Sequence, residues 1–309
     1  GLVKIPPAPI TDTTFSDSSA TQDQTYTYRV KALDREGNEG LVSAGVGVEV
    51  LSAYSAVDTI IDLVADLGTF AQDSKGFLYV TNITSEKIEA FDSTGQKIRE
   101  WATPSRLGSA SRDNNLSINN EDDIYLYTYY DSVTVYDTLG NPVGGFSADI
   151  NSCEGIAFLG DSILIADEQP DRLIKVYDSA GALLGSMNHD WGDGDLFSSL
   201  AVDSAGNVYL YGFLSQGTQS RSRIVDVLDR NGVYIESLFG RTDLPNGMFR
   251  IFGDSMVLTA ADGIYCFTLN GELRFRFSTP VLARNAILLE RGDVLVCFEQ
   301  GVVVVYSQQ

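Results

Sequence analysis

Polar and charged side chains gather at the entrances of several short apolar segments. If these segments pack side by side, the side chains that enter them can converge on one place. Guanidinium, amide and carboxylate groups together suit a small polar ligand or an ion, whereas charges that pair with one another would leave a solvated channel. The candidate ligand-binding residues are Arg112, Asp113, Asn114, Glu154, Ser198, Ser199, Asn246, Arg250, Arg284 and Asn285.

A short acidic segment is the candidate for metal binding. Asp190, Asp193 and Asp195 lie close together, and hard oxygen ligands suit calcium. The spacing is not that of an EF-hand, which needs other ligand positions and a terminal Glu. Asp and Gly also favour plain turns, and residues 119–123 are interpreted as such a turn. We expect no cofactor, with calcium as the alternative.

Tyrosines offer a softer indication of a ligand surface. Strand alternation places Tyr125, Tyr127 and Tyr129 on one face, which is more typical of packed core than of a platform for sugars. Tyr129, Tyr130 and Asp131 come at the following loop and are the better ligand candidates.

The single histidine, His189, limits the chemistry. A metal site with several histidines from this chain is excluded, and a Ser-His-Asp triad would need His189 as its base. His189 lies in an irregular segment, residues 188–196, and is interpreted as an exposed loop residue. We therefore assign no catalytic residue.

The elements that must position these side chains form a repeat. Residues 154–187 predict four short strands, of which the third and fourth are joined by an Asp-x-x-Gly turn. The Asp accepts hydrogen bonds from the following amides, and the Gly takes the left-handed conformation that closes a bulged hairpin. The turn recurs five times, with Thr268 in place of Asp in the last, and its glycines are Gly95, Gly140, Gly181, Gly232 and Gly271.

A period of roughly 40 residues with four strands per unit predicts a β-propeller. A sixth unit has three strands, at 286–289, 293–298 and 302–306. We expect Val57–Val64 to supply its fourth strand and close the ring, because an open ring would leave an unpaired edge. The predicted fold class is all-β: a six-bladed propeller of four-stranded blades closed by an N-terminal strand, plus a small partial β-sandwich module. Residues 212–223 are predicted to form a polar loop in blade four.

Composition excludes some partners. The 309 residues carry a formal charge of −21, with a pI near 4.2, which argues against nucleic acid and anionic membranes as partners. No apolar run approaches the roughly 18 residues of a membrane span, so we expect no membrane insertion of this segment.

The cysteines, Cys153, Cys266 and Cys297, are odd in number. We expect isolated thiols, with a bridge between Cys266 and Cys297 as the alternative.

The first 52 residues differ from the rest. Residues 25–34 alternate as a strand, residues 35–40 form a turn, and residues 42–50 return as its partner. This Tyr-x-Tyr-x-Val-x-Ala strand with its Asp-x-x-Gly-Asn turn resembles the second half of a fibronectin type III domain, in which Tyr26 would form the tyrosine corner. The early strands of that family are absent. We expect domains at 1–52 and 53–309.

The propeller repeats resemble those of NHL-type six-bladed propellers. Residues 201–210 match the family pattern best, and residues 73–80 follow closely. The resemblance implies a fold more than a function, because propellers host binding proteins and enzymes alike. It also implies that sites lie at the axial mouth. Gluconolactonase-like propellers hold a divalent cation there through Glu, Asn and Asp, whereas streptogramin and peptidyl-amide lyases use His.

The sequence supports a non-catalytic binding or scaffolding protein that uses its propeller faces for a protein, glycan or small polar ligand. Fibronectin-like modules beside propellers favour, by family analogy, an extracytoplasmic bacterial protein that is secreted, periplasmic or anchored at the surface. The alternative is a metal-dependent hydrolase or lyase with an axial site, and a third option is a structural spacer.

Overall fold

The computed structural model describes residues 24–34, 37–50, 54–62, 67–103, 116–128, 132–148, 150, 153–167, 173–188, 196–216, 220–238, 247–260, 263–280, 283–289, 292–298 and 302–308. The chain forms two compact units. One lies within Gly1–Ala53, and the other spans Tyr54–Gln308.

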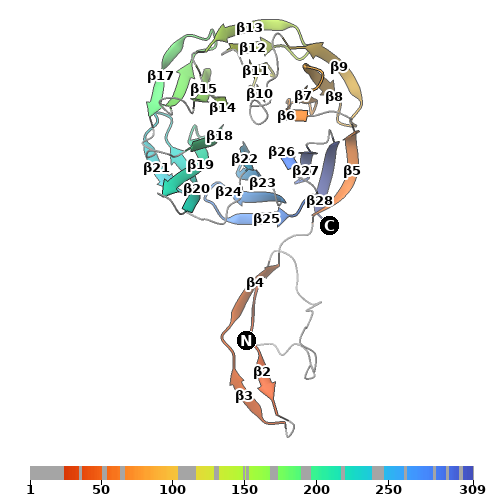
Figure 1. Cartoon of the computed structure of the whole chain (residues 1–309), viewed down its shortest axis with the longest axis vertical. Coiled ribbons are helices and arrows are strands. Elements are labelled where there is room, and N and C mark those ends of the chain that lie inside the picture. The colour runs from red at the N-terminus through yellow and green to blue at the C-terminus, as the bar shows by residue number, and fades with distance from the viewer. Residues whose placement is uncertain are drawn as a thin grey trace. The chain divides into compact units, whose positions relative to one another are not determined.

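The larger unit is a ring of six four-stranded antiparallel sheets, as the sequence predicts (Figure 1). In each of the first five sheets the strand order follows the chain. The first strand of each sheet lies nearest the centre of the ring, so the six inner strands surround the axis (Figure 1). Residues that enter the inner strands therefore meet at the axis even though they are far apart in the chain.

The strand bounds are as follows. Blade one is β6 (Leu67–Gln72), β7 (Leu78–Asn82), β8 (Lys87–Phe91) and β9 (Lys97–Ala102). Blade two is β10 (Leu116–Ile118), β11 (Ile124–Thr128), β12 (Ser132–Tyr136) and β13 (Pro142–Ser147). Blade three is β14 (Cys153–Leu159), β15 (Ser162–Asp167), β16 (Leu173–Tyr177) and β17 (Leu183–Asn188). Blade four is β18 (Leu196–Val202), β19 (Val208–Gln216), β20 (Ser220–Leu228) and β21 (Tyr234–Ser237). Blade five is β22 (Gly247–Phe252), β23 (Ser255–Ala260), β24 (Gly263–Thr268) and β25 (Leu273–Phe277). Blade six is β26 (Ala283–Leu288), β27 (Val294–Phe298), β28 (Val302–Gln308) and β5 (Tyr54–Asp62).

The closing strand comes from the opposite end of the propeller sequence. Strand β5 pairs antiparallel with β28, with Ile61 opposite Val303, which confirms the predicted closure. The strand begins three residues earlier than the sequence indicates. Pairing with β5 leaves β28 no free edge and makes blade six as wide as the others.

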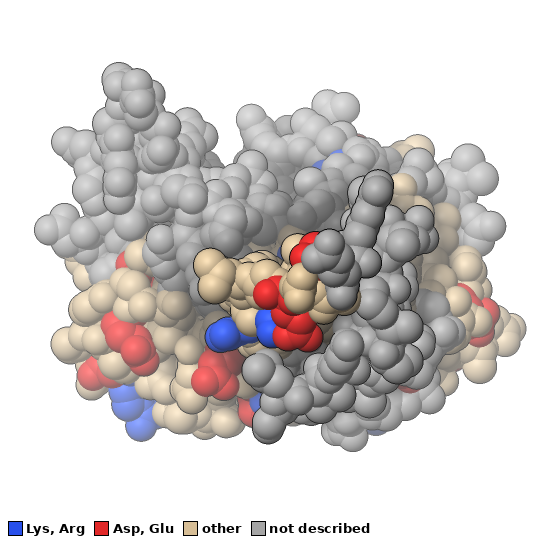
Figure 2. All heavy atoms as spheres, turned by 90° about the horizontal axis from the view of Figure 1, so that it is seen from below, with Lys and Arg blue, Asp and Glu red and all other residues tan. Residues whose placement is uncertain are grey.

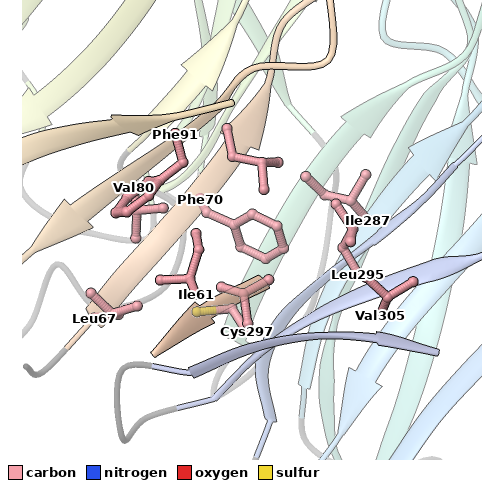
Figure 3. Close-up of a cluster of buried hydrophobic side chains, with 11 residues drawn as sticks. Ile61, Leu67, Phe70, Val80, Phe91, Ile287, Leu295, Cys297 and Val305 are labelled. Atoms are coloured by element: carbon pink, nitrogen blue, oxygen red, sulfur yellow. The ribbon is translucent and has the colours of Figure 1, made fainter. Parts of the chain in front are cut away.

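A hydrophobic cluster fills the seam between blades six and one (Figure 3). Phe70 of β6 is fully buried at its centre, with Ile287 and Leu295 of blade six on one side and Val80 of blade one on the other (Figure 3). Ile61 of the closing strand belongs to the same cluster. Each such side chain stabilises the closed ring by about 1.5–3 kcal/mol on burial.

The corner between the third and fourth strands has the predicted chemistry. In blade one, Asp92 Oδ1 accepts hydrogen bonds from the amides of Thr94 at 2.9 Å and Gln96 at 3.0 Å. Gly95 takes a φ of +81°. The equivalent glycines of blades two to five have φ between +82° and +86°, and each of these hairpins carries a β-bulge at the predicted place.

The same glycines contact the preceding blade. A Cβ placed on Gly140 would lie 2.6 Å from ring carbons of Trp101, which lies near the end of the last strand of blade one. Gly181 abuts Phe146 in the same way, and Gly232 abuts Met187. At these three junctions a large residue near the end of the fourth strand therefore packs on the turn of the next blade, which explains why the sequence pairs these two features.

One sequence prediction in blade four is wrong. Of the predicted polar loop, residues 212–216 and 220–223 instead extend strands β19 and β20, which pair from Val208↔Leu228 to Gln216↔Ser220. Backbone pairing across a hairpin needs no apolar side chains, so a polar composition did not prevent strand formation.

The smaller unit is a two-stranded ribbon in its described part. Strands β1 (Gln24–Tyr28) and β4 (Val46–Val50) pair antiparallel, as do β2 (Lys31–Leu33) and β3 (Glu39–Val42). The predicted long strand is thus interrupted after Tyr28. Val30 is 73% exposed and Leu41 96% exposed, so the described ribbon carries uncovered apolar side chains. The side chain of Tyr26 lies outside the described residues, and its tyrosine-corner role stays a prediction.

Charged side chains are dispersed over the described surface in Figure 2. Acidic and basic groups lie interspersed among uncharged residues, with no continuous basic area among the described residues of that face (Figure 2). The described ranges also contain no helix of the length and hydropathy that a membrane crossing requires.

Substitution of a corner glycine tests the contact between blades. Gly140→Ala introduces a Cβ at positive φ and against Trp101, whereas Gly160→Ala introduces one at a φ of +58° into open space. We expect Gly160→Ala to lower the free energy of unfolding by about 1 kcal/mol, and Gly140→Ala by about 1–3 kcal/mol more. Urea unfolding monitored by tryptophan fluorescence measures both. Equal losses of unfolding free energy in the two variants would show that the Gly140 turn does not pack tightly on the preceding blade.

Candidate functional site

Three side chains from different blades meet near the axis. The Arg250 Nη2 atom on β22 donates a hydrogen bond to Thr69 Oγ1 on β6 at 3.0 Å. Asn285 Nδ2 on β26 donates to the same Thr69 oxygen at 3.2 Å and to the Phe70 carbonyl at 3.1 Å. We call Thr69, Arg250 and Asn285 the axial cluster. It connects blades five, six and one, so it exists only when the ring is closed.

Irregular inner strands aim these residues. Strand β6 carries a β-bulge between Leu67 and Phe70, and β26 carries one between Ala283 and Asn285. A bulge turns the local side chains away from the regular alternation, which is why bulges recur beside functional sites. Thr69 is fixed further by Thr81, whose hydroxyl accepts from the Thr69 amide at 2.9 Å and donates to its carbonyl at 3.1 Å. Thr69 and Asn285 are both fully buried.

Polar side chains also satisfy carbonyl groups across blade junctions. Ser117 Oγ donates to the Ile156 carbonyl at 2.8 Å, and Ser199 Oγ donates to the Phe249 carbonyl at 2.7 Å. The bond from Asn285 to Phe70 does the same at the seam. Buried carbonyls need such partners, so these contacts stabilise the ring. Ser199 is therefore a positioning residue, because it holds the residue next to Arg250.

The charge of Arg250 is the main electrostatic feature of the cluster. The side chain is half-buried, and loss of hydration lowers the pKa of Arg250 to about 10. The guanidinium is still protonated at neutral pH. Its Nε is enclosed by protein without a hydrogen-bond acceptor, and Arg250 forms no ion pair with a described Asp or Glu.

Two further candidates lie half-buried on inner strands, Glu154 on β14 and Arg284 on β26. Their charges act on neighbouring thiols. Burial raises the pKa of Cys297 to about 12, and the positive charge of Arg284 opposes that rise. Burial also raises the pKa of the Cys153 thiol, and the negative charge of Glu154 adds to the rise. Both thiols are therefore protonated and unreactive at neutral pH.

All three cysteines are free, as expected. Cys266 belongs to the cluster between blades five and six, whereas Cys297 belongs to the cluster between blades six and one. The two side chains therefore lie on opposite sides of blade six, which explains the lack of a bridge between them.

Ser198 is half-buried on β18. The remaining sequence-predicted site residues lie outside the described residues. They are Arg112, Asp113 and Asn114, the loop candidates Tyr129, Tyr130 and Asp131, the acidic segment with Asp190, Asp193 and Asp195, and also His189 and Asn246. Within the described ranges no group of three or more His, Cys, Asp or Glu side chains could hold a metal ion. The calcium alternative therefore stays a prediction.

Sequence reasoning named two members of the axial cluster and missed the third. Thr69 joins Arg250 to Asn285, yet threonine is an ordinary strand residue and carries no motif. Thr69, Ser199 and Asn285 all lie at the bulged starts of inner strands, but these bulges are visible only in the structure.

Comparison with known proteins supports the fold. No protein-family model and no curated protein matches the sequence. A solved structure of a gluconolactonase from Xanthomonas campestris is 15% identical with a TM-score of 0.57, covering 80% of this chain and 88% of its own. A catalytically inactive virginiamycin B lyase from Staphylococcus aureus, solved with quinupristin, is 10% identical with a TM-score of 0.56 and covers 91% and 88%. The likeness is one of fold.

Truncation of Asn285 tests how far the axial cluster stabilises the ring. Asn285→Ala removes both Nδ2 bonds and leaves the buried Phe70 carbonyl without that donor. We expect the free energy of unfolding to fall by about 2–3 kcal/mol. Asn231→Ala, in an exposed corner turn, should cost at most about 0.5 kcal/mol. Chemical denaturation of both variants measures the difference, and similar small losses would contradict a tightly bonded cluster.

Proposed function

We propose that this chain is a non-catalytic binding protein whose propeller takes a small polar ligand at the axial cluster. The observation that supports this is the set of hydrogen-bonding side chains from blades five, six and one around one buried hydroxyl. Thr69 and Asn285 are fully buried whereas Arg250 is half-buried, so the guanidinium would contact the ligand while the other two hold it in place. None of the three is a general base at neutral pH, so the cluster favours binding over proton abstraction.

The finer family assignment belongs to the same proposal. The corner turns and strand pattern support an NHL-type propeller, and the ribbon within residues 24–50 is compatible with part of a fibronectin type III-like module. By that resemblance we place the protein outside the cytoplasm, where it would bind a protein, a glycan or a smaller polar molecule. A scaffolding role on the outer faces is compatible with ligand binding at the axis.

A metal-dependent hydrolase or lyase is the second candidate. The two structural neighbours, by their titles a gluconolactonase and a virginiamycin B lyase, favour it. Such a site would use Glu154, Asn114 and Asn285. However, Asn285 Oδ1 already accepts the Ala286 amide at 2.8 Å, which leaves this oxygen less free to act as a metal ligand.

Metal analysis separates the two candidates. Binding of metal to the folded state alone must raise the melting temperature. The binding proposal therefore expects no stoichiometric divalent metal by inductively coupled plasma mass spectrometry, and the same Tm in calcium and in EDTA.

Stoichiometric metal with a lower Tm in EDTA would overturn the proposal in favour of the hydrolase or lyase. Two variants would then locate the metal. Glu154→Gln should release an axial ion, and Asp193→Asn should release an ion from the acidic segment.

A further inference from the structure

The axial cluster has more hydrogen-bond donors than acceptors among its own side chains. Asn285 Oδ1 accepts the Ala286 amide, and Thr69 Oγ1 accepts from both Arg250 and Asn285. The Thr69 and Phe70 carbonyls accept from Thr81 and Asn285. The acceptors are thus engaged, whereas a guanidinium has five N–H donors and Arg250 uses one on Thr69.

The charge balance points the same way. Elsewhere in the propeller, a largely buried cation has a close carboxylate: Lys175 Nζ lies 2.9 Å from Asp167 Oδ2 of the same blade. Arg250 has no such partner in the part of the chain that the structure describes, and its enclosed Nε has no acceptor. A buried charge without a counter-charge is costly, and the cost falls when an anion pairs with it.

We propose that the axial cluster binds an oxyanion, the carboxylate or phosphate group of a small ligand, with Arg250 as the charged contact. This inference rests on the proposed function and specifies the ligand class for that site. An oxyanion supplies hydrogen-bond acceptors for the unused N–H donors of Arg250 and a negative charge for its guanidinium. Charge-assisted hydrogen bonds to guanidinium are among the strongest in proteins.

The contacts indicate how the oxyanion is held. Because Nε is enclosed, the ligand meets the outer Nη edge of the guanidinium. Thr69 is fully buried and its Oγ1 accepts from both Arg250 and Asn285, so it positions the guanidinium and does not itself meet the ligand. Asn285 holds Thr69 in this orientation through its bonds to Oγ1 and to the Phe70 carbonyl. The unused N–H donors of this Nη edge can then contact oxygens of the same group.

The overall charge of −21 does not oppose such a site at short range. Charges farther away than about 8 Å are largely screened at physiological ionic strength. Recognition therefore depends on local donors, and the negative surface slows the approach of anions without cancelling the contact.

The test is ligand-dependent melting of the full chain in a low-chloride buffer. The probes are sodium acetate, inorganic phosphate, neutral acetamide and sodium chloride at matched ionic strength. We expect a saturable rise in Tm with acetate or phosphate that acetamide and chloride do not produce. Of acetate and phosphate, the probe with the lower half-saturation concentration shows whether the site prefers a carboxylate or a phosphate group.

Variants locate the effect. Arg250→Gln should weaken oxyanion binding at least tenfold, whereas Arg274→Gln, on β25 of the same blade and paired with Asp254 at 2.7 Å, should leave it unchanged. If Arg250→Gln does not fold, Thr69→Val removes the acceptor that positions the guanidinium, keeps its charge, and should weaken binding severalfold.

Absence of a saturable oxyanion response in the wild type, or equal binding by Arg250→Gln and Arg274→Gln, would overturn the inference. A panel of neutral sugars separates failure of the oxyanion inference from failure of the proposed binding function. If a neutral sugar raises the Tm through Arg250 and oxyanions do not, the oxyanion inference fails and the axial binding site stands. If neither class binds, both fail.

Discussion

The contact between a corner glycine and a large side chain of the preceding blade recurs at three successive junctions of the ring. A Cβ on Gly140 would collide with Trp101, so the two blades can approach closely only because the turn residue lacks a side chain. The Asp of the same turn fixes the conformation that makes the glycine necessary. One five-residue motif therefore shapes the hairpin and seats it on its neighbour.

The axial cluster depends on that spacing. Arg250, Asn285 and Thr69 come from three consecutive positions on the ring, and their bonds of 3.0 and 3.2 Å have little tolerance for a shift between blades. The hydrophobic cluster around Phe70 also packs blades six and one against each other. Apolar packing between the blades and polar contacts at the axis thus stabilise the same arrangement.

The fold could be read from the sequence because its signals are local, whereas the site could not. Gly95 and Gly181 mark hairpins whose geometry is decided within five residues. The link through Thr69 joins residues distant in the chain and exists only after ring closure, so no local pattern reports it. Blade four shows the converse failure, because residues 212–216 and 220–223 have a loop-like composition but pair as strands.

Closure by β5 has a consequence for the order of events during synthesis. The strand that completes blade six is made before the other propeller strands, while its partner β28 is the last propeller strand to be made. Until then β5 has an exposed edge and Ile61 has no seam to fill. Non-local pairing of this kind slows folding and prolongs exposure to aggregation, so the final step of folding is expected to be docking of a strand that has waited for the rest of the propeller.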